Sequence, residues 1–305
     1  MSKPFGVAAA TVLVAAGLSM PAAAGSTHHL QVGIFDQSYV ITSPAEAFPL
    51  LHKLRVQVLR LSLDWSKVAR TRPRRAANPN DPNYDWSLPD RLVRYAAYRQ
   101  IKVLFSIYGT PSWASAYLAP NHAPKNAADL QNFAYAAATR YSGTFKPRGA
   151  TKALPAVRLW LAWNEPNNPV FLKPQWSRVS GRWVAQSAKD YVAICTAVWT
   201  GVHSTGISGE KVACGATAPR GNNAPTSSRP SVAPQTFLAA LKRFGLRDFD
   251  AYAHHPYAGS PHETPTTKPT GGAVTLANIG SLISELTRLY GPKPLWITEY
   301  GYQTN

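Results

Sequence analysis

Cysteine, acidic side chains and long apolar runs are all scarce in this chain of 305 residues. Two cysteines are too few for a disulfide framework or for a zinc site with four cysteine ligands. No segment beyond the N-terminus is apolar for long enough to span a bilayer, so membrane insertion is not expected. With 45% hydrophobic and 15% charged residues, the composition is that of a globular protein with a large core, not of a disordered or fibrous one.

The shortage of acidic residues leaves a strongly basic chain. Fifteen Asp and Glu face 32 Lys and Arg, which gives a formal net charge of +17. Such a charge suits a polyanion, be it nucleic acid, anionic lipid or acidic polysaccharide, without selecting one. Four arginines crowd the loop after the second predicted strand. This loop is either simply solvated or attracts an anionic wall polymer or a uronic-acid-bearing glycan; its arginines are Arg70, Arg72, Arg74 and Arg75.

The N-terminus has the pattern of a secretory signal peptide. Lys3 precedes the apolar run Val7–Leu18, which is too short to cross a bilayer, and Pro21 and a run of alanines follow. We predict cleavage after Ala24 and a secreted mature domain over residues 25–305, acting as a monomer. Export makes nucleic acid an unexpected partner despite the basic charge.

Seven apolar, β-rich runs predict strands: Gln31–Phe35, Val56–Leu63, Val103–Ile107, Val157–Ala162, Val212–Ala216, Asp250–Ala253 and Leu295–Thr298. Between them, apolar residues at helical spacing predict amphipathic helices over 88–96, 184–199 and 279–290. Alternation of strands with helices is typical of a parallel sheet with crossover helices.

The predicted loops are unequal in length. Those that follow strands are long, as at 65–87, 109–129 and 164–182, whereas Gly291–Pro294 is a short loop before a strand. This asymmetry predicts a (β/α)8 TIM barrel whose site lies at the C-terminal face of the strands. A doubly wound open sheet is the alternative, but segment 36–39, after the first strand, lacks the glycine of a phosphate-binding turn.

Two predicted strands end on a glutamate. The fourth runs through Leu-Trp-Leu-Ala-Trp to Asn164 and Glu165 and stops at a proline, and the seventh ends at Glu299 in Thr-Glu-Tyr-Gly. Each glutamate alone could bond a helix N-terminus or a loop. Two carboxylates at one barrel mouth, however, are what glycoside hydrolysis needs, because one protonates the leaving oxygen while the other attacks or activates water.

With these motifs the chain resembles a clan A glycoside hydrolase, in particular families 5 and 39, the cellulase-like and β-xylosidase-like barrels. The resemblance covers most of the mature chain. It implies a retaining reaction on a β-linked glycoside or polysaccharide, with Glu165 as acid/base, Glu299 as nucleophile and Asn164 holding the substrate 2-hydroxyl. No cofactor is expected. No histidine stands beside Ile107 to Thr110, which weakens a plain cellulase assignment.

Arg60 interrupts an apolar strand, where an unpaired charge is costly, so it requires a carboxylate partner. The resemblance places this arginine beside the nucleophile Glu299. Asp36 and Asp64 are the alternative partners.

The run His254-His255-Pro-Tyr257 follows the sixth predicted strand. The resemblance assigns His255 and Tyr257 to a His-x-Tyr pair that lines the sugar site, with the tyrosine hydroxyl orienting Glu299. Adjacent histidines are also compatible with metal ligation, but neighbouring strand residues point to opposite faces and no third ligand is evident, so we expect no metal. His254 should face the helices or the adjoining loop.

Tryptophans lie just beyond several strand ends and are candidate sugar platforms, with core packing as the alternative. These are Trp65, Trp113, which belongs to a Thr-Pro-x-Trp turn similar to one in clan A families, and Trp163. Trp160, Trp199 and Trp296 are interpreted as core. Cys195 and Cys214 lie on a helix and the next strand, and form either a disulfide or two buried thiols.

Two other functions stay open: a carbohydrate-binding barrel that lost turnover, and a basic polyanion-binding module.

The number of predicted strands leads to one more expectation. Seven strands are predicted and Asn305 lies six residues beyond Glu299, so we expect a C-terminally truncated barrel that lacks its eighth β/α unit, with the first and seventh strands not hydrogen-bonded to each other.

Overall fold

The alternation of strands and helices predicted from the sequence is present in the computed structural model, which describes residues 30–260 and 262–302. The chain divides into two units, Met1–Gln31 and Val32–Asn305. Only Leu30 and Gln31 of the first unit are described, so the following concerns the second. The predicted signal peptide and its cleavage site lie outside the described residues.

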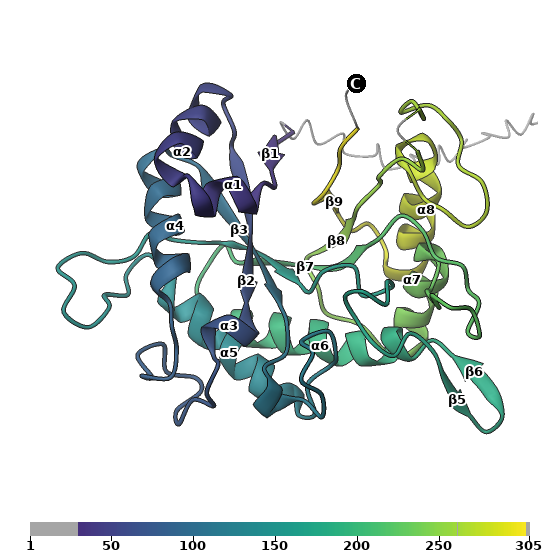
Figure 1. Cartoon of the computed structure of the whole chain (residues 1–305), viewed down its shortest axis with the longest axis horizontal. Helices are drawn as coiled ribbons and strands as arrows, with labels where there is room; N and C mark the ends of the chain where they lie inside the picture. The colour runs from purple at the N-terminus through teal and green to yellow at the C-terminus, as the bar shows by residue number, and fades with distance from the viewer. Residues whose placement is uncertain (1–29, 261, 303–305) are drawn as a thin grey trace, which may run out of the picture. The chain divides into compact units, whose positions relative to one another are not determined.

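Seven parallel strands form one sheet within the described residues, in the order β1-β2-β3-β4-β7-β8-β9. Their bounds are β1 (Gly33–Ile34), β2 (Val58–Asp64), β3 (Lys102–Tyr108), β4 (Leu159–Ala162), β7 (Lys211–Thr217), β8 (Ala251–His254) and β9 (Leu295–Ile297). Each coincides with a predicted run. The sheet curls into a half-barrel (Figure 1), and in the described chain β1 and β9 stand at its two ends and are not paired with each other, as expected. The fold is thus a partial (β/α)8 barrel.

The helices are α1 (Gln37–Thr42), α2 (Pro44–Lys53), α3 (Trp65–Val68), α4 (Ser87–Tyr98), α5 (Ala127–Arg140), α6 (Gln186–His203), α7 (Pro234–Arg243) and α8 (Ile279–Tyr290), with short 3-10 turns at Ser112–Ala114 and Leu276–Asn278. The three predicted helices are α4, α6 and α8. Among the residues that the structure describes, no helix is both long and apolar enough to cross a bilayer.

A two-stranded antiparallel hairpin, β5 (Ser177–Val179) with β6 (Arg182–Val184), was not predicted. Its first strand lies within the long loop expected over 164–182, whereas its second strand runs past the end of that loop to Val184, the first residue of the helix predicted over 184–199. Each strand has only three residues, which is too short for the period-2 pattern of a strand to be recognised in the sequence.

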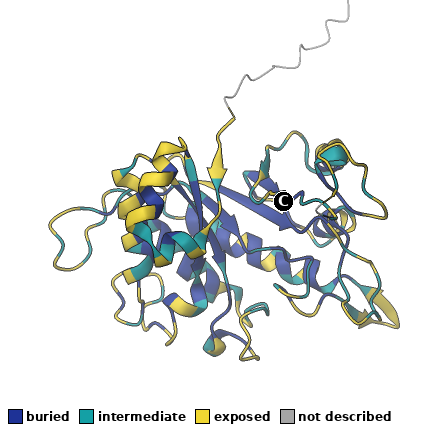
Figure 2. Ribbon diagram, turned by 45° about the horizontal axis from the view of Figure 1, so that its top comes forward, coloured by how far each residue is buried: buried dark blue, intermediate teal, exposed yellow. Residues whose placement is uncertain are grey.

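The sheet has an apolar layer on each side because successive strand residues point to opposite faces. On β2 the leucines at 59, 61 and 63 belong to the large core beneath the helices, whereas Arg60 points the other way. A smaller cluster lines the opposite side of the sheet; it consists of Leu104, Leu161, Ala213, Ala216, Ala251 and Ala253. Figure 2 shows buried strands behind helices whose outer faces are exposed. Trp160 is fully buried, and Trp199 and Trp296 pack half-buried against these clusters, as predicted.

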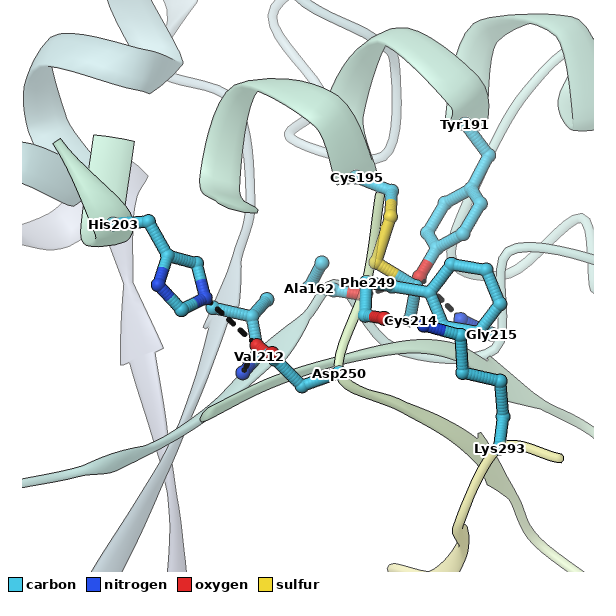
Figure 3. Close-up of a disulfide and its surroundings, with 10 residues drawn as sticks. All are labelled: Ala162, Tyr191, Cys195, His203, Val212, Cys214, Gly215, Phe249, Asp250 and Lys293. Carbon is cyan, nitrogen blue, oxygen red and sulfur yellow. Dashed lines mark hydrogen bonds and ion pairs between the residues drawn. A yellow bond between two sulfur atoms is a disulfide. The ribbon is translucent and has the colours of Figure 1, made fainter. Parts of the chain in front are cut away.

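A disulfide ties α6 to β7 (Figure 3). Cys195 and Cys214 are bonded with their Cα atoms 5.9 Å apart, which decides between the two states that the sequence left open. Beside the bridge, the buried Tyr191 hydroxyl donates to the carbonyl of Ala162 at 2.7 Å and accepts the backbone N–H of Gly215 at 2.7 Å. The tyrosine thereby fixes the C-terminal end of β4 relative to β7, which is where the predicted site begins.

Candidate active site

The guanidinium group of Arg60 binds several of the other polar residues of the site. Arg60 is 4% exposed, and its Nη1 donates to a carboxylate oxygen of Glu299 and, at 3.2 Å, to the carbonyl of Thr298. Its Nη2 donates to Oδ1 of Asn164 at 2.7 Å and to the hydroxyl of Ser106 at 3.3 Å. One guanidinium therefore binds side chains from β3 and from the ends of β4 and β9, and brings them together across the sheet.

The alternative partners of Arg60 are engaged elsewhere. Asp36 caps α1 by accepting the backbone N–H of Tyr39 at 3.2 Å. Asp64 caps α3 by accepting the backbone N–H of Lys67 at 3.3 Å, and it also accepts from the hydroxyl of Ser66 at 2.6 Å. Among the three carboxylates that the sequence allowed, Arg60 is paired with Glu299.

Glu165 lies in a strained turn after β4. Its φ of +38° and that of Trp163, +69°, fall in the left-handed region that non-glycine residues seldom adopt. The backbone N–H of Glu165 donates at 2.9 Å to the carbonyl of Ala216, whose own φ is +46°, at an irregularity in the β7–β8 register. Strain of this kind persists where the surroundings over-determine the backbone, and it often accompanies functional sites.

His255 and Tyr257 connect the two glutamates. Nδ1 of His255 lies 3.1 Å from Oε1 of Glu165 and 3.7 Å from Oε2 of Glu299, and its Nε2 lies 3.0 Å from the Thr298 hydroxyl. The hydroxyl of Tyr257 donates to Oε2 of Glu299 at 3.1 Å. An oxygen of each glutamate and a nitrogen of His255 all lie within 4.8 Å of one another. The predicted polar members of the site thus converge.

The two carboxyl groups have different electrostatic surroundings. Burial raises the pKa of Glu165 above its ordinary value, which the hydrogen bond from Asn168 and the charge of Arg60 only partly offset. Glu299 instead has the guanidinium of Arg60 and a tyrosine hydroxyl bound to its oxygens. Burial, followed by the charge of Glu299, raises the pKa of Tyr257, so this hydroxyl remains a donor.

His255 is a neutral imidazole. Burial lowers its pKa to about 3, so it carries no charge at neutral pH and has one N–H and one acceptor nitrogen. Its neighbour His254 faces away, with Nε2 3.0 Å from the carbonyl of Val274 in the loop before α8, as predicted.

Three ligand atoms for a metal ion are offered, in the part of the chain that is described, by Glu165, His255 and Glu299. The guanidinium of Arg60 already binds Glu299 and holds a positive charge in the space that a cation would share. A metal cation bound to Glu299 would be repelled by this guanidinium. The three residues are therefore better suited to transferring a proton than to binding a metal ion.

Two of the three predicted sugar platforms are wrong. Trp65 is 1% exposed and packs against Phe133, with centroids 5.8 Å apart, and Trp163 is 0% exposed and donates its Nε1 to the carbonyl of Phe171. Both rings continue the helix-side core beyond the strand ends, which strand position alone does not reveal. Trp113 remains a candidate, half-buried with the guanidinium of Arg72 5.2 Å from its ring centroid.

Two polar residues of the site were not singled out from the sequence. Ser106 is the one polar residue in the apolar run Val103–Ile107 of β3, and its hydroxyl lies on the same side of the sheet as Arg60, so an isolated polar residue in a buried strand is a signal that could have been used. Asn168 donates its side-chain amide to Oε2 of Glu165 at 3.0 Å. The run Pro166–Pro169 predicts a turn, but not the direction in which that amide points.

Comparison with solved structures shows what the fold is similar to. A family 39 glycoside hydrolase from the gut symbiont Bacteroides cellulosilyticus WH2 matches with a TM-score of 0.58 at 17% identity, over 89% of this chain and 49% of its own. A glucosidase from Croceicoccus marinus matches with a TM-score of 0.59 at 14% identity, over 90% of this chain and 52% of its own. One of two fungal β-1,4-galactanases matches with a TM-score of 0.55 at 15% identity, over 89% and 74%.

The chain therefore has the fold of glycosidase barrels, and the resemblance stated from its motifs is confirmed at that level. It spans about half the length of the first two of these structures. No family model matches the chain, and a search of curated proteins finds no match.

Proposed function

We propose that this chain is a retaining glycoside hydrolase that acts on a β-linked glycoside or polysaccharide, with Glu165 as acid/base and Glu299 as nucleophile. The observation that carries the proposal is the convergence of the two carboxyl groups at the ends of β4 and β9. An oxygen of Glu165 lies within 4.8 Å of an oxygen of Glu299. Retaining enzymes place their carboxyl groups about 5–5.5 Å apart, whereas inverting enzymes need about 6.5–9.5 Å to admit a water molecule.

The surroundings of the two carboxyl groups divide the chemical roles. Because the pKa of Glu165 is raised by burial, this residue can keep a proton and give it to the glycosidic oxygen as that bond breaks. Glu299, bound by Arg60 and Tyr257, attacks the anomeric carbon and forms a glycosyl ester. Glu165, now ionised, then takes a proton from water, whose oxygen attacks the anomeric carbon and releases Glu299.

Stereochemistry tests this assignment directly. Two successive displacements at the anomeric carbon should yield a first-formed product with the anomeric configuration of the substrate. We expect ¹H NMR of an aryl β-glycoside digest, recorded before mutarotation, to show the β anomer first. A first-formed α anomer would mean that water attacks directly, and a panel without any hydrolysis would favour the carbohydrate-binding barrel.

The basic loop between β2 and α4 supports an acidic glycan as the substrate. All four of its arginines, at 70, 72, 74 and 75, are exposed, and the loop follows a strand end at the edge of the sheet where the carboxylates lie. Arg72 pairs with Asp129 at 3.0 Å and contacts Trp113. The other guanidinium groups remain available to carboxylates of a uronic-acid-bearing or anionic wall polymer.

A charge-matched pair of variants tests this preference. We expect Arg74→Gln with Arg75→Gln to lower kcat/KM on a uronate-containing β-glycan about threefold to tenfold at low salt, and added NaCl to remove the difference. Arg91→Gln with Arg94→Gln on the exposed side of α4 is the control with the same charge change. Equal losses in both double variants would show that net charge, not this loop, attracts the substrate.

Secretion is also part of the proposal. It is supported by the pattern of residues 1–24 and by the Cys195–Cys214 disulfide, since such bonds persist in oxidising compartments. N-terminal sequencing of the exported protein is expected to begin at Gly25, and a protein kept inside the cell with Met1 intact would contradict it.

A further inference from the structure

The turn after β4 holds the side chain of Asn168 in one orientation. Its Oδ1 accepts the backbone N–H of Val170 at 3.1 Å, and its Nδ2 donates to Oε2 of Glu165 at 3.0 Å. The backbone N–H of Asn168 donates to the carbonyl of Glu165 at 2.9 Å. Because the oxygen end of the amide is engaged by a backbone donor, the nitrogen end must face the carboxyl group.

The two oxygens of Glu165 therefore differ. Oε2 receives an N–H that can only donate, so it must offer a lone pair there. Oε1 lies 3.1 Å from Nδ1 of His255, which is itself 3.7 Å from Oε2 of Glu299, so Oε1 is the oxygen on the side of the nucleophile. In the tautomer of the neutral imidazole in which Nε2 donates to the Thr298 hydroxyl, Nδ1 is an acceptor and can take a hydrogen bond from a protonated Oε1.

We propose that Asn168 is a positioning residue that places the transferable proton of Glu165 on Oε1, facing Glu299, and holds that carboxyl group against rotation. The inference rests on the proposed function, because the proton matters only if Glu165 is the acid. The reaction itself is unchanged: the proton leaves Oε1 for the glycosidic oxygen as the glycosidic bond breaks. Asn168 binds Oε2 of Glu165 and not the oxygen that carries the transferred proton, so its effect on the reaction is exerted through Glu165.

The charged and titratable groups around Glu165 come from three strands and the residues that follow them. They are Arg60 on β2, His254, His255 and Tyr257 on and after β8, and Glu299 after β9. None of them replaces the donor of Asn168 at Oε2, which favours the ionised carboxylate. Burial raises the pKa of Glu165 and the hydrogen bond from Asn168 lowers it. Without that bond, the pKa of Glu165 should therefore rise further.

Asn168→Ser is the test variant, because a serine hydroxyl can still accept a backbone N–H in a similar turn but does not reach Oε2. Asn168→Asp is the second variant; it keeps the shape and the acceptor and replaces the donor by a carboxylate. Asn80→Ser, at an exposed turn residue, is the matched control.

Two measurements on the full chain separate this inference from the proposed function. The first is a ¹³C NMR titration of carboxyl-labelled glutamates, with the Glu165 signal assigned by its loss in Glu165→Gln; it requires no turnover. The second is the pH profile of kcat on aryl β-glycosides with good and poor leaving groups. Circular dichroism checks that each variant is folded.

We expect Asn168→Ser to raise the pKa of Glu165 by about one unit and Asn168→Asp by more, with no change in the control. The alkaline limb of the profile should move upward by the same amount, and kcat should fall more for poor leaving groups. A folded Asn168→Ser protein with an unchanged Glu165 pKa, or with equal losses on both substrates, would overturn the role of Asn168. Absence of hydrolysis by the unsubstituted protein would refute the proposed function instead.

Discussion

Replacement of Glu299 by alanine should abolish hydrolysis. In the proposed mechanism this carboxylate forms the glycosyl ester, because the other glutamate is the one that delivers the proton. We expect kcat to fall by about 10⁴-fold or more on every substrate, including aryl glycosides with good leaving groups, because attack on the anomeric carbon is then lost for all of them.

Glu299→Ala also removes the partner of a buried guanidinium, so activity must be separated from stability. Arg60 is 4% exposed, and leaving such a charge unpaired costs several kcal/mol, about 3–5 for a fully buried pair. Glu299→Gln keeps an acceptor for Arg60 and should retain the fold while being as inactive. Glu285→Ala, on the exposed side of α8, is the matched control. A folded Glu299→Gln protein with more than a tenth of the original activity would rule out this nucleophile.

The loss of activity on replacing Glu165 by alanine should instead depend on the substrate. A leaving group that is stable as an anion departs without protonation, whereas an alkoxide does not, so the loss in the first step should grow with the pKa of the leaving group. General acid catalysis contributes about 10²–10⁴-fold, and we expect losses near the upper value for natural glycosides and near the lower for dinitrophenyl glycosides.

The measurement is a plot of log kcat/KM against leaving-group pKa for both proteins. The slope should be steeper in Glu165→Ala than in the unsubstituted chain. Parallel lines would show that Glu165 does not protonate the leaving oxygen. The alkaline limb of the pH profile, which follows the protonated acid and so lies above the usual range for glutamate, should also vanish in the variant.

Interactions close in the sequence made much of the fold predictable. Apolar, β-rich runs located all seven strands of the sheet, and the helical spacing located α4, α6 and α8. The same reasoning put Glu165 and Glu299 at strand ends, because parallel strands present their carboxyl ends at one edge. The hairpin β5–β6 was not predicted because a strand of three residues is too short for its pattern of apolar and polar residues to be distinguished from that of a loop.

The identity of each partner was decided by the tertiary structure. The sequence allowed Arg60 three carboxylates and allowed Cys195 and Cys214 two states, and the fold selected Glu299 and the disulfide. It also buried Trp65, which strand position had suggested as a sugar platform.

What the sequence by itself determined about this protein is the order of its helices and strands and the two strand ends that carry Glu165 and Glu299. Only the tertiary structure decided that Asn168 turns its amide toward Glu165 and that His255 lies between the two glutamates. The physical reason is one of scale. Alternation along a strand is set by neighbouring residues, whereas a contact of about 3 Å between side chains far apart in the chain depends on the curl of the whole sheet.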